Sequence, residues 1–108
     1  MIKKSKVIFA NESLQKSFDK LPEADDLKKF LIRAIKDLQE NAFCGIQLSK
    51  DLIPKEYIQK YAINNLWKYN LPNGWRLIYS VISPNKIELI SAILDWCDHK
   101  NYERRFHY

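Results

Sequence analysis

The spacing of hydrophobic residues predicts two helices after a short N-terminal strand. Residues 5–10 are mostly β-branched and aromatic, as is typical of a strand, and they end at Asn11, a favourable helix N-cap. A short helix is predicted by hydrophobic residues at helical spacing followed by a proline: Leu14, Phe18, Leu21 and Pro22.

A second and longer amphipathic helix follows, ending near Asn41 or Gly45. Its hydrophobic face is formed by Leu27, Phe30, Leu31, Ala34, Ile35 and Leu38, and its outer face by Lys28, Lys29, Arg33, Lys36 and Asp37. Two helices separated by a few residues form an αα-hairpin, whose apolar face needs a sheet to cover. Residues 46–63 carry a weaker pattern: Pro54 favours a short helix over 54–61, with an ordered loop as the alternative.

After Asn64 the hydrophobic period changes to two, which indicates strands. Pro72-Asn73-Gly74 reads as a hairpin loop. A three-residue loop pairs Leu71 with Trp75 and Asn70 with Arg76. It gathers one set of side chains on the face toward the helices and another on the opposite face. The first set is Trp67, Tyr69, Leu71, Trp75, Leu77, Tyr79 and Val81, and the second is Lys68, Asn70, Arg76 and Ser80. The aromatic residues of the first set are therefore interpreted as core rather than as a base-stacking platform.

A further turn at Ser83-Pro84-Asn85 predicts a long strand over 86–96. The polar, basic tail 98–108 is predicted to be helical, with Tyr102 and Phe106 packed inward. The whole chain, 1–108, is then a single α+β domain of two layers. It has an N-terminal strand, an αα-hairpin, three hairpin-connected antiparallel strands and a short helical tail. The sheet face away from the helices is expected to be uncovered and basic.

The charge of the chain is concentrated in the part that reads as sheet. The formal net charge is +5, but residues 11–40 are nearly neutral, with six basic and seven acidic side chains. Residues 52–87 carry five basic side chains and only one acidic one, Glu56. A positive field attracts polyanions, although a solvated basic surface explains +5 equally well.

Several protein classes are disfavoured by composition. No apolar run approaches the roughly 18 residues that span a bilayer, and no apolar segment follows the basic N-terminus as a signal peptide requires. A cytoplasmic protein is expected, with Cys44 and Cys97 as reduced core residues. His99 and His107 lie near Cys97 at a spacing that matches no common zinc pattern, so no metal site is predicted.

Two short segments carry a family resemblance. The hairpin over 65–79, read as Asn-Leu-Trp-Lys-Tyr-Asn-Leu-Pro-Asn-Gly-Trp-Arg-Leu-Ile-Tyr, resembles the central hairpin of the RelE/ParE toxin superfamily. Asp98-His99-Lys100-Asn101-Tyr102 is similar to the His-(Lys/Arg)-x-x-Tyr element that these toxins carry after their last strand. The predicted β-α-α-β-β-β order matches that superfamily over essentially the whole chain.

The resemblance implies a RelE-like mRNA interferase of a type II toxin–antitoxin system. Such a toxin cleaves mRNA in the ribosomal A site by attack of the ribose 2′-hydroxyl on the adjacent phosphate, without a metal or other cofactor. A cognate antitoxin would neutralise it in a hetero-oligomer, and no membrane is involved. The alternatives are a toxin of the same fold without nuclease activity, such as a ParE-like gyrase inhibitor, and a basic RNA-binding or partner-binding module.

The cleavage chemistry needs a base, an acid and cations that stabilise the phosphate. Arg76 is the candidate phosphate clamp because a guanidinium can grip two phosphate oxygens; the alternative is an ion pair with Asp95 or Glu88. His99 is the candidate acid or base because the pKa of free histidine lies near neutral. Tyr102 would stack on a base or transfer a proton, unless it is a core aromatic that holds the tail.

The remaining candidates are basic, and each has the alternative of a solvated side chain. Lys100, a catalytic candidate, and Lys68 would hold phosphates or shift the pKa of a neighbouring group, and Lys60, Lys55 and Arg104 would extend the RNA-binding path. The identity of the general base stays open between His99, Tyr102 and Glu56, since some family members use a glutamate before the central hairpin. The terminal His107-Tyr108 echoes the C-terminus of one subgroup, but that alignment turns the segment after Trp96 into an insertion, so His99 and Tyr102 are preferred.

Overall fold

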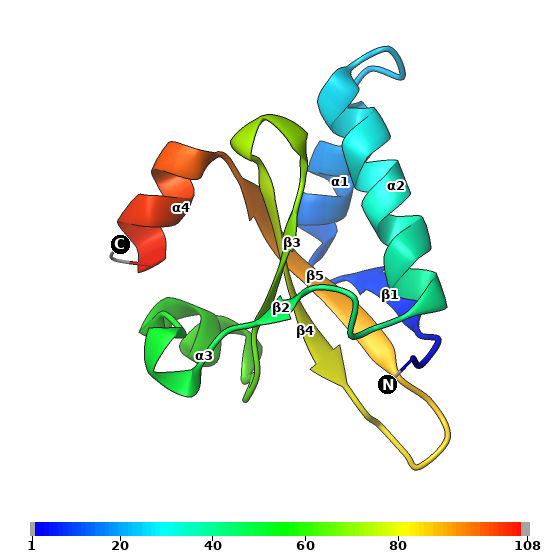
Figure 1. Cartoon of the computed structure of the whole chain (residues 1–108), viewed down its shortest axis with the longest axis vertical. Coiled ribbons are helices and arrows are strands. Elements are labelled where there is room, and N and C mark those ends of the chain that lie inside the picture. The colour runs from blue at the N-terminus through cyan, green and yellow to red at the C-terminus, as the bar shows by residue number, and fades with distance from the viewer. Residues whose placement is uncertain (1, 107–108) are drawn as a thin grey trace.

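A computed structural model describes residues 2–106 as an α+β domain with a five-stranded mixed sheet (Figure 1). The strands are β1 (Lys6–Phe9), β2 (Ile46–Gln47), β3 (Trp67–Asn70), β4 (Arg76–Ile82) and β5 (Ile90–Cys97). The α-helices are α1 (Glu12–Lys20), α2 (Asp26–Glu40), α3 (Lys55–Tyr61) and α4 (His99–Phe106). The order across the sheet is β1-β5-β4-β3-β2, with β1 parallel to β5 and the other neighbours antiparallel.

The helices that were predicted in the first half of the chain are confirmed. Asn11 caps α1, where its side chain accepts a hydrogen bond of 2.7 Å from the Leu14 N–H. The assignment of Lys28 to the outer face of α2 is wrong, because this side chain is buried. Its ammonium donates to the Phe18 carbonyl at 2.8 Å and lies 4.2 Å from the centre of the Phe18 ring. A cation near the last turn of α1 is favoured by the helix dipole, which explains how a lysine is accommodated there.

The hairpin of β3 and β4 has the predicted three-residue loop. Asn70 pairs with Arg76, and the Leu71 N–H donates to the Trp75 carbonyl at 2.8 Å. Asn73 and Gly74 both adopt positive φ, at 61° and 80°. The predicted inward-facing set packs with α1 and α2 in one core, as expected from period two.

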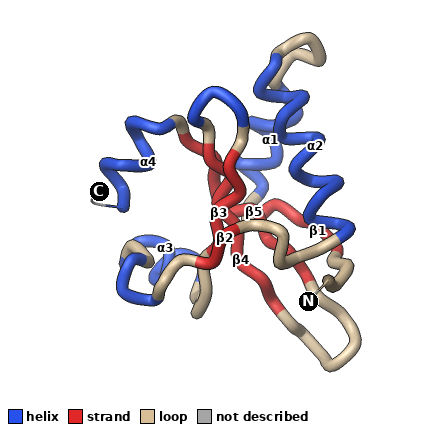
Figure 2. The backbone as a smooth tube through the Cα atoms, viewed as in Figure 1, coloured by secondary structure: helices blue, strands red, loops and turns tan. Residues whose placement is uncertain are grey.

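The opposite face of the sheet is covered, so the prediction of an uncovered second face is wrong. A second core packs α3 and α4 against this face, and Figure 2 shows helices on both sides of the strands. Leu66 and Ile78 have no exposed surface in this core, and Ser80, expected on an open face, is 1% exposed. The short helix at 54–61 is confirmed as α3, and the predicted tail helix as α4. The terminal His107-Tyr108 lies outside the described residues.

The strand that was predicted over 86–96 begins only at Ile90. The Asn85 side chain accepts hydrogen bonds of 2.8 Å from the backbone N–H groups of both Ile87 and Glu88. Such local bonds offer the backbone an alternative to strand pairing, so the segment before Ile90 forms a loop. The two-residue strand β2, which pairs with β3, was not predicted.

The two cysteines are unpaired thiols in different environments. Cys97 is buried in the second core, but Cys44 is exposed, so the prediction of a core position holds only for Cys97. Burial raises the pKa of Cys97 to about 11, so its thiol stays protonated near neutral pH. Cys97 therefore contributes packing rather than a nucleophile.

Within residues 2–106 there is no helix long and apolar enough to cross a membrane. The same residues contain no group of three or more His, Cys, Asp or Glu side chains that could hold a metal ion.

Tyr69 links the sheet to α2 and makes the stability of the fold depend on pH in the alkaline range. Burial and a hydrogen bond from its hydroxyl to Asp37 raise the pKa of Tyr69 to about 12. In the unfolded chain the phenol returns to its ordinary pKa near 10, so it loses its proton there first. The stability that Tyr69 contributes is therefore complete below pH 10 and is lost as the pH rises toward 12. Urea unfolding at pH 9 and pH 11.5 should show a smaller alkaline loss for Tyr69→Phe than for the unaltered chain; equal losses would contradict this.

Candidate functional site

Among residues 2–106, no carboxylate contributes to the contacts that hold Arg76, the first residue of β4. Its Nη1 donates to the Gly74 carbonyl at 2.5 Å, and its Nη2 lies 3.2 Å from His99 Nδ1. The Cζ atom lies 5.2 Å from the centre of the Tyr102 ring, a cation–π arrangement. The Nε atom is buried and makes no hydrogen bond within residues 2–106. The guanidinium is thus positioned by a carbonyl, an imidazole and an aromatic ring.

Arg76 does not form the ion pair with Asp95 or Glu88 that was the alternative to a phosphate clamp. Asp95 forms its ion pair with Arg105, and no ion pair to Arg76 exists among residues 2–106. Glu88 lies in the loop before β5, whereas Arg76 pairs with Cys97 at the far end of that strand. The positive charge of Arg76 is therefore not neutralised by any carboxylate of the described part of the chain.

Lys68 on β3 brings a second cation to the same ring. The β3–β4 register pairs Asn70 with Arg76, so Lys68 lies two residues away on the same face. Its Nζ is 5.2 Å from the centre of the Tyr102 ring, the same distance as the Arg76 Cζ. Two cations that approach one ring repel each other, and an anion placed between them would relieve that repulsion. Lys68 and Arg76 thus bring two positive charges to the Tyr102 ring.

Helix α4 carries His99 to this place. Asp98 caps the helix, accepting a hydrogen bond of 2.9 Å from the Asn101 N–H. Tyr102 and Phe106 anchor it in the second core, with ring centres 4.5 Å apart. The first turn of α4 lies so close to the hairpin loop that a Cβ on Gly74 would be 3.2 Å from the His99 Cβ.

His99 bridges Arg76 and a residue that the sequence reasoning did not single out, Glu103. The His99 Nε2 lies 2.8 Å from Glu103 Oε1, one helical turn further along α4. The side chains of His99 and Glu103 are 60% and 48% exposed, so the imidazole is accessible from solvent. The contact could have been predicted from the sequence, because residues four positions apart in a helical tail lie next to each other.

The other predicted site residues lie in three different places. Tyr102 is 2% exposed, so its ring is a support for Lys68 and Arg76 and has no free face on which a base could stack. Lys100 and Arg104 are exposed on α4, and Arg104 donates to the Asn101 side chain. Lys55 and Lys60 lie on α3 and do not join the cluster of Arg76, Lys68 and His99.

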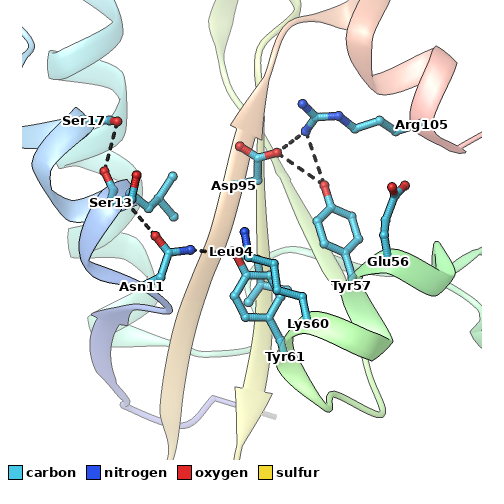
Figure 3. A pocket seen from close by; sticks show the side chains of 11 residues that line it. Asn11, Ser13, Ser17, Glu56, Tyr57, Lys60, Tyr61, Leu94, Asp95 and Arg105 are labelled. Atoms are coloured by element: carbon cyan, nitrogen blue, oxygen red, sulfur yellow. Dashed lines mark hydrogen bonds and ion pairs between the residues drawn. The ribbon is translucent and has the colours of Figure 1, made fainter.

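A cleft of about 430 Å³ lies between α1 and α3, and Leu94 and Asp95 of β5 also line it (Figure 3). Here Arg105 of α4 donates to Asp95 and, at 3.4 Å, to the Tyr57 hydroxyl. Burial and the Asp95 charge raise the pKa of Tyr57 above its usual value, so the phenol stays protonated. Lys60 and Glu56 also line this cleft, whereas Arg76 and His99 do not. Glu56 therefore stands apart from the Arg76 site, and Asp95 is already occupied by Arg105.

The comparisons with known proteins found no relative. No protein-family model matches the chain, and no curated protein or solved structure matches it either.

Proposed function

We propose that the chain is an mRNA endoribonuclease toxin of the RelE-like type, which acts on ribosome-bound mRNA and is neutralised by a cognate antitoxin. The observation that carries the proposal is the convergence of Arg76, Lys68 and His99, with no carboxylate of residues 2–106 paired to Arg76. The order of strand, two helices, central hairpin, last strand and histidine-bearing tail, with β2 and α3 between α2 and the hairpin, supports the RelE-like assignment. So do the motifs at 65–79 and 98–102.

The arrangement fits the needs of phosphodiester cleavage by an internal nucleophile. The ribose 2′-oxygen attacks the adjacent phosphorus, its proton passes to a base, and the bond from phosphorus to the 5′-oxygen breaks. The products are a 2′,3′-cyclic phosphate and a 5′-hydroxyl, once an acid has protonated the leaving oxygen. Arg76 and Lys68 stabilise the charge that builds on the phosphate oxygens. His99 lies within hydrogen-bond reach of Arg76, where a proton must be moved.

The decisive experiment is induction of the chain in bacterial cells without any antitoxin, followed by mapping of mRNA 5′ ends on translating ribosomes. Cuts in phase with codons, absent with Arg76→Ala, are the expected result. The matched control is Arg33→Ala, which removes an arginine that is 79% exposed on α2 and pairs with Asp37. Cuts that persist in Arg76→Ala, or the absence of any toxicity, would overturn the proposal.

Growth arrest with intact mRNA and damaged DNA would instead indicate a gyrase inhibitor of the same fold. In that case Arg76→Ala and His99→Ala should leave toxicity unchanged, because gyrase inhibition does not need a phosphate clamp beside an imidazole. An antitoxin gene is expected next to the gene for this chain, and its co-expression should restore growth.

A further inference from the structure

We propose that Glu103 is a positioning residue that holds His99 as the general base, with the unprotonated Nδ1 directed at the phosphate site. The inference rests on the proposed endoribonuclease function, and it assigns the base that the sequence left open between three residues. Glu103 touches no reacting atom and acts through His99.

Arg76 fixes the role of one imidazole nitrogen. A guanidinium has five N–H donors and no acceptor, so a group that bonds to it must accept. The contact of 3.2 Å between Arg76 Nη2 and His99 Nδ1 therefore requires an unprotonated Nδ1. Since a neutral imidazole carries one proton, that proton lies on Nε2.

Glu103 completes the assignment from the other side of the ring. Its Oε1 lies 2.8 Å from His99 Nε2, and a carboxylate can only accept. The two contacts thus select the same tautomer, Nε2–H with a free lone pair on Nδ1. Because Glu103 follows His99 by four residues, the helical geometry of α4 itself maintains the contact.

The tautomer places the lone pair where the proposed reaction needs it. When a phosphate takes the Arg76 donors, Nδ1 is left facing the bound ribose-phosphate and can accept the 2′ proton. The imidazolium that forms carries the accepted proton on Nδ1 and keeps its original proton on Nε2. The Glu103 carboxylate beside Nε2 stabilises the positive charge. This is the division of labour by which a carboxylate orients a catalytic histidine in hydrolytic triads.

The charged surroundings of His99 are consistent with this role. Arg76 faces Nδ1 from β4 and Glu103 faces Nε2 from α4. Asp98, next to His99 in the chain, is engaged with the Asn101 N–H, and Lys68 lies over the Tyr102 ring. Among the described residues, Glu103 is thus the one carboxylate within hydrogen-bond distance of the His99 ring.

The first test measures the tautomer without any substrate. Long-range proton–nitrogen NMR spectra of the ¹⁵N-labelled chain distinguish a protonated ring nitrogen from an unprotonated one, and His99→Asn identifies the His99 signals. The expected result at alkaline pH is an unprotonated Nδ1 and a protonated Nε2. In Glu103→Ala a population with the proton on Nδ1 should appear. A dominant Nδ1–H form in the unaltered chain, or a Glu103→Ala spectrum identical to it, would overturn the inference.

The second test separates positioning from binding. Glu103→Ala should lower kcat for RNA cleavage about tenfold and leave KM within about twofold, because the phosphate contacts of Arg76 and Lys68 persist. Glu103→Gln keeps an acceptor oxygen but not the charge, so its kcat should fall less than that of Glu103→Ala. Glu12→Ala is the matched control, since Glu12 forms an exposed i,i+4 pair with Lys16 at 3.6 Å on α1.

The two proposals fail in different ways. A chain that cuts no RNA overturns the endoribonuclease function, while the NMR spectra still decide whether Glu103 sets the tautomer. A chain that cuts RNA, loses activity with His99→Ala, and retains full kcat with Glu103→Ala overturns the positioning role alone.

Discussion

Arg76→Ala is expected to reduce the rate of RNA cleavage by a factor on the order of 10²–10³. The substitution removes the donors that face the developing charge on the phosphate, and no other arginine approaches the Tyr102 ring among the described residues. It also removes the partner of His99 Nδ1. Single-turnover cleavage on programmed ribosomes measures the effect directly.

Arg76→Lys separates charge from geometry. A lysine keeps the positive charge but cannot contact the Gly74 carbonyl, His99 and two phosphate oxygens with one planar group. We therefore expect activity between that of the unaltered chain and that of Arg76→Ala. Arg33→Ala should retain full activity. If Arg76→Ala kept cleavage within about threefold while its urea midpoint was unchanged, the phosphate-clamp role would be wrong.

Tyr79→Ala is expected to lower the free energy of unfolding by about 3–5 kcal/mol, the usual cost of deleting a large buried ring. Tyr79 has no exposed surface and lies in the core between the sheet and α2. Its hydroxyl donates to the Ala42 carbonyl at 2.9 Å and accepts from the Gly45 N–H at 3.0 Å. The residue therefore fastens the segment after α2 to the centre of the sheet. Urea unfolding of both chains at neutral pH measures this difference in the free energy of unfolding.

Tyr79→Phe isolates the hydroxyl group. It preserves the ring but leaves the two backbone groups of Ala42 and Gly45 without their partner, and we expect a loss of about 1–3 kcal/mol. Ile87→Ala, which truncates a side chain that is 93% exposed, should change stability by less than about 0.5 kcal/mol. Equal stability of Tyr79→Phe and the unaltered chain would show that these backbone groups find other partners at no cost.

Gly45 shows why this segment tolerates little change. A Cβ at Gly45 would lie 2.6 Å from both the Lys68 carbonyl oxygen and the Tyr79 hydroxyl, closer than real Cβ contacts allow. The backbone of residue 45 thus passes directly against β3, the strand that carries Lys68 into the site. The same contacts that hold the core therefore also fix one of the two cations over Tyr102.

The sequence by itself determined the elements whose signals are local. Helical spacing placed α1 and α2, and a period of two with Pro72-Asn73-Gly74 placed the hairpin and its register. That register was enough to put Lys68 and Arg76 on one face, because side chains alternate strictly along a strand. The predicted burial of Tyr102 and Phe106 in a tail helix also followed from their spacing.

Only the tertiary structure decided how the second face of the sheet is used. Residues from α3 and α4 cover it, and the sequence pattern of each helix is too short to show against what it packs. Partner choice was decided in the same way: Asp95 pairs with Arg105 rather than Arg76, and Lys28 turns inward to a carbonyl of α1. The contact of His99 with Arg76 joins residues 23 positions apart, and it exists because the core side chains of α4 dock on the sheet. Local periodicity carries no information about such long-range contacts, since they depend on how separate elements share one core.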